Sequence, residues 1–344
     1  MLNKNNTLPV VGITHGDVNG ISYEIILKSL ANPLLLELCI PVIYGSSRVI
    51  SFYRKLLNLH EYMITITKDV SSLRPGRVYV YNVTQEEIKI DVGNATEIAA
   101  IYAIKALDQA IEDAKKGFLD ILVTAPLNKH TCQQVVGEFT GHTHYLAQKF
   151  SALDYIMMML SPHMRLGLVT EHVPLKDVSS HLTIQQILTK INLMYQSLRF
   201  DFGILNPNIA VLSLNPHGGD EGTLGTEEQE ILIPAIQSAF MNKINVFGPF
   251  SADGFFGAYH HRKFDGVLAM YHDQGLIPFK LLGWEEGVNY TMGLPIVRTS
   301  PAHGVAYDIA GKNKASERSM TSAIMLGLDI LQRRLNAIDS LEQK

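Results

Sequence analysis

The chain has 344 residues, of which 47% are hydrophobic and 18% are charged. This composition is typical of a folded globular protein, and the length predicts about two domains of ordinary size. The formal net charge of -4 at pH 7 excludes the broad basic surface on which non-specific nucleic-acid binding depends.

The cysteine content and the apolar runs predict a cytoplasmic protein without a membrane partner. Cys39 and Cys132 are too few for a disulfide framework, and they suit a reducing compartment. Residues Met1 to Leu8 lack the apolar core of a signal peptide. The longest apolar run, Pro33 to Tyr44, contains Glu37 and is shorter than the roughly 20 residues that cross a bilayer.

Apolar runs alternate with helical patterns in the first third of the chain. Continuous apolar runs predict strands at Pro9–Thr14, Cys39–Tyr44 and Val78–Asn82. Helices are predicted at Tyr23–Leu30 and Ser47–Leu57. This alternation predicts an α/β fold.

A long helix is predicted from Asn94 to Lys116, just before Gly117. Asn94 is a favourable N-cap, and Glu97 three residues later completes a capping box. A short strand at Ile121–Val123 follows and ends in the loop Thr124–Asn128.

Later strand candidates each run directly into a loop that contains histidine or asparagine. These strands are Leu166–Val169, Ile209–Ser213 and Gly266–Met270. Because ligands of open α/β sheets bind at the carboxyl ends of strands, these loops are candidate functional segments.

Three histidines of the 13 in the chain follow such strands: His172, His217 and His272. Three imidazoles suit a catalytic divalent metal that keeps one coordination position open for substrate. The alternative is that each histidine caps an element or makes one hydrogen bond in the core.

Two further groups of residues are candidates for binding an anionic substrate. His142 and Thr143 carry polar side chains that could donate hydrogen bonds to a polar substrate. In the alternative, an extended segment turns His142 and His144 to the same side as a second metal pair. Lys280, Asn289 and Arg298 follow at intervals of nine residues, and lysine and arginine are the usual anion ligands. Exposure to solvent without a ligand is the alternative for the two cations.

Asp253 and Asp273 are candidates for orienting a metal-bound imidazole or accepting a proton, and helix capping is an equal alternative. Gly12, Gly16 and Gly20 lack the spacing of the dinucleotide fingerprint. A Rossmann domain of the ordinary kind is therefore not predicted.

Six segments of the sequence together resemble one enzyme family, the 4-hydroxythreonine-4-phosphate dehydrogenases of vitamin B6 biosynthesis. The resemblance covers almost the whole chain. The matching segments are ITHGDVNGIS (Ile13–Ser22), VTAPLNK (Val123–Lys129), GHTHYLA (Gly141–Ala147), LNPHGGDEGTLGTEE (Leu214–Glu228), AMYHDQGLIPFK (Ala269–Lys280) and VNYTMGLPIVRTS (Val288–Ser300).

The resemblance implies a two-domain α/β/α fold of the isocitrate and isopropylmalate dehydrogenase type. Its active site would lie in the cleft between the domains and at a homodimer interface, with one metal histidine supplied by the partner chain. We expect residues 1–135 and 300–344 to form the first domain and residues 136–299 the second. The family's metal and substrate positions match these residues: His172, His217, His272, His142, Thr143, Lys280, Asn289 and Arg298.

The segment Ala302–Lys312 is similar to the adenosine-binding loop of isocitrate and isopropylmalate dehydrogenases. The resemblance therefore implies that His303, Gly304 and Asp308 contact NAD. Several positions depart from the family pattern. The usual GDPAGIGPE reads GDVNGISYE at Gly16–Glu24, and Tyr307 replaces a small apolar residue. Glutamate is usual at His144, and aspartate at Ala302.

The function implied is the NAD-dependent oxidation and decarboxylation of 4-phosphooxy-L-threonine to 3-amino-2-oxopropyl phosphate, assisted by zinc, magnesium or cobalt. Lys280 would help to hold the substrate, and Asp273 or Asp253 would pass on the alcohol proton. One alternative is a dehydrogenase for D-threonate or D-erythronate 4-phosphate. Others are a histidine-metal phosphoester hydrolase and a catalytically silent binding protein.

Overall fold

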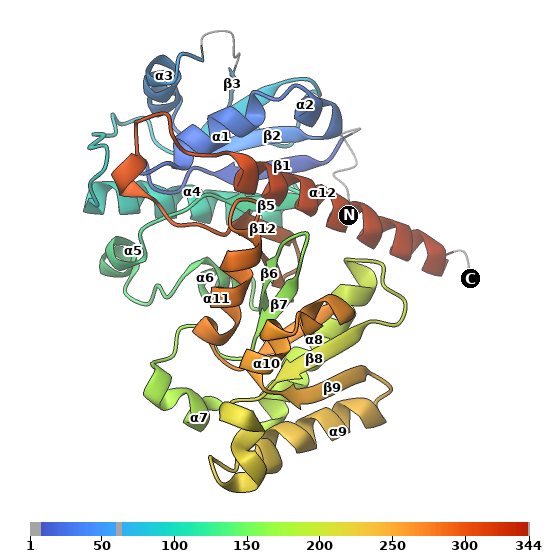
Figure 1. The fold of residues 1–344 in the computed structure, drawn as a ribbon. Coiled ribbons are helices and arrows are strands. Elements are labelled where there is room, and N and C mark those ends of the chain that lie inside the picture. The colour runs from blue at the N-terminus through green and yellow to red at the C-terminus, as the bar shows by residue number, and fades with distance from the viewer. Residues whose placement is uncertain (1–7, 60–63, 343–344) are drawn as a thin grey trace. The chain divides into compact units, whose positions relative to one another are not determined.

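The computed structural model describes residues 8–59 and 64–342 (Figure 1). The chain divides into two compact units, here called unit 1 (Met1–Ala152 and Leu294–Leu335) and unit 2 (Leu153–Gly293 and Asn336–Lys344). The divisions fall after Ala152, Gly293 and Leu335, whereas the sequence led us to expect two, after residues 135 and 299. His142, Thr143 and Arg298 therefore belong to unit 1.

The sheet of unit 1 is parallel. Its described strands run in the order β3-β4-β2-β1-β5-β12, and each neighbouring pair is parallel. The strands are β1 (Val10–Thr14), β2 (Ile40–Gly45), β3 (Ile64–Thr67), β4 (Val78–Asn82), β5 (Ile121–Thr124) and β12 (Val297–Pro301).

Helices follow most strands of unit 1, as in other parallel sheets. The long helix α4 packs against β1, β2 and β5 (Figure 1). The helices are α1 (Ser22–Leu30), α2 (Leu34–Leu38), α3 (Ser47–Leu56), α4 (Glu97–Lys115), α5 (Lys129–Val136), α6 (His142–Lys149) and α12 (Arg318–Glu342), with the short turn η5 at Tyr307–Ile309.

The sheet of unit 2 is mixed. Its described strands run in the order β11-β6-β7-β10-β8-β9, with β6 antiparallel to both β11 and β7. The pairs β7 with β10, β10 with β8 and β8 with β9 are parallel. The strands are β6 (Ile156–Leu160), β7 (Arg165–Leu168), β8 (Asn208–Leu212), β9 (Asn245–Phe250), β10 (Gly266–Ala269) and β11 (Val288–Met292).

The helices of unit 2 include α8, which packs against β6, β7, β10 and β11. The α-helices are α7 (Val178–His181), α8 (Ile184–Phe200), α9 (Ile233–Met241), α10 (Ala252–Gly257) and α11 (His272–Gly283). Short helical turns are η1 (Leu175–Asp177), η2 (Pro216–Gly222), η3 (Glu228–Leu232) and η4 (His260–Lys263).

The predicted α/β class is confirmed, because parallel strands alternate with helices in both units. All residues of β1 are buried, as expected of a parallel strand covered on both faces. Gly12 in β1 has no room for a side chain, since a Cβ there would lie 2.5 Å from Leu119 Cδ1.

The start of α4 differs from the prediction. Thr96 is the N-cap, and its side chain accepts a hydrogen bond from Ala99 N. Asn94 lies in the preceding turn, where its side chain donates to Asp91 and its carbonyl accepts from Asn19. The helix thus starts two residues beyond the expected cap, because a long-range contact with Asn19 and a local one with Asp91 hold Asn94 in the turn. Separately, no helix of the described ranges is long and apolar enough to span a bilayer.

Candidate active site

Three neighbouring parallel strands of unit 2 end at the predicted metal ligands. β10 lies between β7 and β8, so the carboxyl ends of all three strands lie at one edge of the sheet. His172 follows β7, His272 follows β10 and His217 follows β8. The topology therefore places His272 between the other two predicted ligands.

His172 and His272 are close neighbours, with 5.9 Å between their ring centroids. His272 is the first residue of α11, rather than part of a loop as we expected. Its Nδ1 lies 2.7 Å from Asp273 Oδ1. Because a carboxylate oxygen accepts, Nδ1 donates this hydrogen bond, and Nε2 is the ring nitrogen left for a metal.

The two imidazoles fit one divalent ion, since zinc–nitrogen bonds of about 2.0–2.1 Å leave space for an ion between rings at this separation. Among the described residues, no group of three histidine, cysteine, aspartate or glutamate side chains forms a metal site. The structure therefore brings two of the three predicted ligands, His172 and His272, close together.

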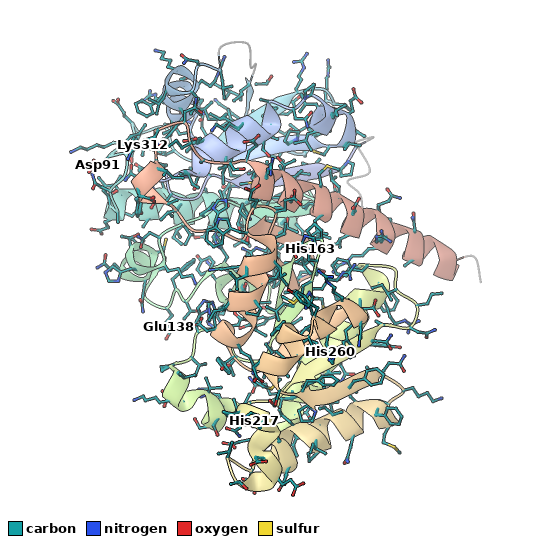
Figure 2. The ribbon with its side chains drawn as sticks, viewed as in Figure 1. Asp91, Glu138, His163, His217, His260 and Lys312 are labelled. Carbon is teal, nitrogen blue, oxygen red and sulfur yellow. The ribbon has the colours of Figure 1, made fainter. Side chains whose placement is uncertain are left out.

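His217 lies on a left-handed turn after β8, seen in Figure 2. Five successive residues, 217–221, have φ between 44° and 79°, although only Gly218 and Gly219 are glycines. Each non-glycine residue in this conformation costs of the order of 1–2 kcal/mol, so other contacts must hold the turn.

The buried carboxylate of Glu228 supplies such contacts. It is 1% exposed and accepts hydrogen bonds from the backbone N–H groups of Leu214 and Asn215 at 2.8 and 2.7 Å. Asn215 Nδ2 also donates to Glu228 and to Glu227, at 2.9 and 2.7 Å. Glu228 thereby fixes the residues that lead into the turn carrying His217.

We expect Glu228→Gln to lower the free energy of unfolding by about 2–3 kcal/mol, because the amide loses the charge that strengthens two backbone hydrogen bonds. Denaturant titration measures this effect. The matched control is Glu227→Gln, which removes the charge of a more exposed neighbour and should cost less than about 1 kcal/mol. Equal effects of the two changes would contradict the role of Glu228.

A pocket of about 320 Å³ adjoins this turn and is lined by His217, Asp253, Tyr271 and Gln274, among others. Asp253 lies in the first turn of α10, where it reaches the same pocket as His217. Gln274, which the sequence analysis missed, accepts from Met270 N and donates to Ser213 O at 2.6 Å. It thus ties the ends of β10 and β8 together.

Lys280 and Asn289 also lie in unit 2. Lys280 is in the last turn of α11, and its Nζ is 5.6 Å from the ring centroid of Trp284. Asn289 lies on β11 opposite Met159 of β6.

In unit 1, His142 is the first residue of α6 and Thr143 the second. The alternative of an extended segment that turns His142 and His144 to one side is therefore wrong. Gly141, with φ of 147°, precedes the helix and offers no capping side chain. The N-terminus of a helix carries partial positive charge, which favours an anion there.

Arg298 lies inside β12, which begins at Val297, rather than at the end of a strand. Its side chain is 1% exposed and donates to Thr124 Oγ1 at 2.6 Å and to Ser300 Oγ at 3.1 Å. Lys129 is a further residue near the start of α6, and it was not among the predicted site residues. Its Nζ would lie 3.8 Å from a Cβ built on Gly141, the residue before this helix.

Burial lowers the pKa of His142 well below its ordinary value, and the charges of Arg298 and Lys129 lower it further. His142 is therefore neutral at pH 7. This lowering of the pKa indicates that the positive charges of Arg298 and Lys129 both act on His142, the first residue of α6. This part of unit 1 is suited to a phosphate or carboxylate group.

The predicted cofactor residues lie in the loop after β12. His303 Nδ1 faces Gly304 O at 3.0 Å, while its buried Nε2 has no hydrogen-bond partner among the described residues. Burial also lowers the pKa of His303, so the ring is neutral and Nε2 is an acceptor. Asp308 is exposed in the short turn η5.

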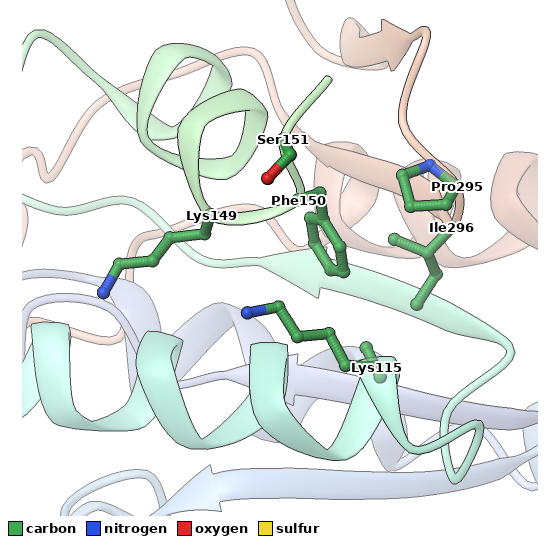
Figure 3. A pocket seen from close by; sticks show the side chains of 7 residues that line it. Lys115, Lys149, Phe150, Ser151, Pro295 and Ile296 are labelled. Carbon is green, nitrogen blue, oxygen red and sulfur yellow. The ribbon is translucent and has the colours of Figure 1, made fainter.

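Another pocket, of about 410 Å³, lies in unit 1 and contains none of the predicted site residues (Figure 3). Lys115 and Lys149 line it together with Phe150. Their ammonium groups lie 3.2 Å from Glu112 and 3.2 Å from Asp108, respectively. We assign no role in the reaction to this pocket.

The fold and these side chains define the class: an α/β protein with a buried arginine in β12 of unit 1 and two histidines that lie close together after neighbouring strands of unit 2. The family model described as "Pyridoxal phosphate biosynthetic protein PdxA" matches residues 37–327. A 4-hydroxythreonine-4-phosphate dehydrogenase of Bacteroides thetaiotaomicron is 46% identical over 325 residues, which are 94% of this chain and 89% of that protein.

Two other comparisons agree with this match. A protein of Oceanobacillus iheyensis, provisionally named D-threonate 4-phosphate dehydrogenase, is 38% identical over 94% of this chain and 98% of its own. The crystal structure of 4-hydroxythreonine-4-phosphate dehydrogenase from Klebsiella pneumoniae gives a TM-score of 0.78 at 33% identity, covering 96% of this chain and 100% of that one. The chain belongs to the PdxA family of pyridoxal phosphate biosynthetic proteins.

Proposed function

We propose that the protein is an NAD-dependent 4-hydroxythreonine-4-phosphate dehydrogenase of pyridoxal phosphate biosynthesis. It would oxidise the secondary alcohol of 4-phosphooxy-L-threonine to a ketone and release the carboxylate as carbon dioxide, which yields 3-amino-2-oxopropyl phosphate. The observation that carries this proposal is the 46% identity to a dehydrogenase of that name over 94% of the chain.

Four side chains of unit 1 support a phosphorylated carboxylic acid as substrate: Lys129, His142, Thr143 and Arg298. Arg298 is buried, and its charge and that of Lys129 act on His142 at the start of α6. His142, Thr143 and Arg298 would hold an anionic group of the substrate. We propose Lys280 and Asn289 as further substrate contacts.

His172 and His272 would hold a divalent ion such as zinc, magnesium or cobalt, and we propose His217 as the third ligand. The unpartnered Nε2 of His303 fits a hydrogen-bond donor such as the amino group of adenine, and Gly304 and Asp308 would be its neighbours in an NAD site. When bound, the metal supplies stabilisation of negative charge on oxygen and NAD supplies the hydride acceptor.

Two carboxylates of unit 2, Asp273 and Asp253, are the proposed groups for proton transfer. Asp273 orients the His272 ring through the bond to Nδ1 and, because its side chain is 73% exposed, could pass a proton to water. Asp253 reaches the pocket that His217 lines and is the other proposed proton acceptor for the alcohol.

A substrate panel followed by NADH absorbance tests this proposal. We expect the highest kcat/KM with 4-phosphooxy-L-threonine among three acids, the others being D-threonate and D-erythronate 4-phosphate. The Oceanobacillus relative's name favours D-threonate 4-phosphate as the second candidate. A preference for that acid would assign the alternative dehydrogenase function. Phosphate release without any nucleotide would assign a hydrolase instead.

We propose that the enzyme works as a homodimer and that α11 lies at the interface. Ile277 and Leu281 of α11 are 59% and 82% exposed and, four residues apart, lie on one face of the helix. Trp284, the residue directly after α11, is 60% exposed. Because α11 begins at His272, a second copy on this face would supply one of the three proposed metal histidines.

We expect Leu281→Glu to convert the dimer to a monomer, because a carboxylate buried in an apolar interface without a partner is strongly unfavourable. Size-exclusion chromatography with light scattering measures the mass. The control is Leu205→Glu, at a leucine of similar exposure, 79%, which should leave the dimer intact. A dimeric Leu281→Glu protein would contradict the placement of the interface.

We also propose a cytoplasmic location. Cys39 and Cys132 are both free and buried, as is usual for thiols in a reducing compartment. Subcellular fractionation of the source cells tests this, and recovery in an oxidising compartment would contradict it.

A further inference from the structure

Three loops of unit 1 meet at the carboxyl edge of its sheet. β5 lies between β1 and β12 in a parallel arrangement, so the loops after these three strands share one edge. Ile21 N donates to Val305 O at 3.0 Å, and Asp17 N donates to Pro126 O at 2.8 Å. The loop that carries the proposed cofactor residues is thus bonded to the first loop of the chain.

The side chain of Tyr307 makes a hydrogen bond between two of these loops that are far apart in sequence. Its hydroxyl donates to Asp17 Oδ2 at 2.5 Å, across 290 positions of sequence. Asp17 is 1% exposed, and its other oxygen accepts from Asn19 N at 2.8 Å. The Tyr307 hydroxyl therefore joins the loop after β12 to the loop after β1, and the bond from Asp17 N to Pro126 O joins that loop to the one after β5.

A fourth segment, residues 91–96, packs against the same loop. Asn19 accepts from Asp91 N and donates to Asn94 O, at 2.8 and 3.0 Å. A Cβ on Gly93 would lie 3.3 Å from Tyr307 O, and one on Gly311 would lie 2.8 Å from Val92 Cγ1. Figure 2 shows Asp91 and Lys312 at this junction.

The backbone at Tyr307 requires such support. Ala306, the preceding residue, has φ of 44°, which is unfavourable for a residue with a side chain. In η5 the side chain of Tyr307 is partly buried, whereas Asp308, a proposed cofactor contact, is exposed to solvent.

We propose that Tyr307 is a positioning residue that holds the 303–311 loop in the conformation that binds the dinucleotide, through its hydroxyl bond to Asp17. This inference rests on the proposed function. At the first loop, this chain has Val18 and Asn19 where the resembled pattern has proline and alanine. Proline restricts the backbone directly, whereas here hydrogen bonds from Asn19 and Tyr307 restrain the loops.

Tyr307→Phe tests the proposal because it removes only the hydroxyl. In the cofactor-free protein, hydrogen–deuterium exchange should become faster at the amides of Ile309 and Ala310, which close the turn. In titrations followed by NADH fluorescence, the dissociation constant should rise about tenfold, since fewer molecules hold the binding conformation. The value of kcat at saturating NAD should change by less than about twofold.

The matched control is Tyr79→Phe, which removes a hydroxyl that bonds locally, five residues away, with the backbone N–H and carbonyl of Arg74. It should leave both loop exchange and NADH affinity unchanged. Unchanged exchange in Tyr307→Phe, or faster exchange with unchanged NADH affinity, would overturn the proposal. Wild-type protein that binds no NADH would instead overturn the proposed function, and the exchange comparison would still decide whether Tyr307 orders the loop.

Discussion

Replacing Arg298 with alanine is expected to lower kcat/KM for 4-phosphooxy-L-threonine by about 10³-fold. Its guanidinium is 1% exposed and is held by Thr124 and Ser300. A buried charge that contacts an anion contributes about 3–5 kcal/mol, and each 1.4 kcal/mol corresponds to a factor of ten. The loss should fall on both KM and kcat, because a loosely held substrate is also misaligned.

Two further measurements separate this effect from damage to the fold. Adding guanidinium ions should restore part of the activity of Arg298→Ala, because the free cation can enter the space left by the side chain. Arg165→Met is the control: this half-buried arginine donates to Asp265 O and stacks on Phe202 in unit 2. Activity of Arg298→Ala within tenfold of wild type would contradict its role in substrate binding.

Replacing His272 with alanine is expected to abolish metal binding and to lower turnover by more than about 10³-fold. His272 follows the central strand of the β7-β10-β8 group and contacts the ring of His172. Loss of one ligand from a site of three leaves too few donors to hold the ion. Elemental analysis of the purified protein gives the metal content per chain.

His217→Ala should show the same loss, and His163→Ala is the control. His163 is exposed on the turn before β7 and is neither a predicted metal ligand nor a predicted substrate contact. Full metal content together with full activity in either His272→Ala or His217→Ala would remove that histidine from the proposed site.

The strand-end histidines illustrate what sequence patterns predict well. β8 and β10 are continuous apolar runs, and parallel strands that are neighbours present their ends at one edge. The proximity of His172 and His272 depends on strand order, which the sequence analysis did not derive. The left-handed turn at His217 was also missed, because it depends on the buried carboxylate of Glu228.

Other features were missed because they depend on partners distant in sequence. Asn94 and Glu97 match the sequence pattern of a capping box. In the structure, a hydrogen bond from the distant Asn19 and one to the nearby Asp91 hold Asn94 in a turn before the helix. The bond between Tyr307 and Asp17 joins residues 290 positions apart, so no local pattern predicts it. The burial of Arg298 likewise depends on its place within β12.

The reaction that we propose for this chain is the oxidation and decarboxylation of 4-phosphooxy-L-threonine. The most direct measurement incubates the purified enzyme with this acid, NAD and, in turn, zinc, magnesium or cobalt, and quantifies NADH and carbon dioxide together. We predict equal amounts of both products, loss of both on addition of a chelator, and recovery when metal is restored. Absence of NADH with every metal, or release of phosphate in place of carbon dioxide, would contradict the account.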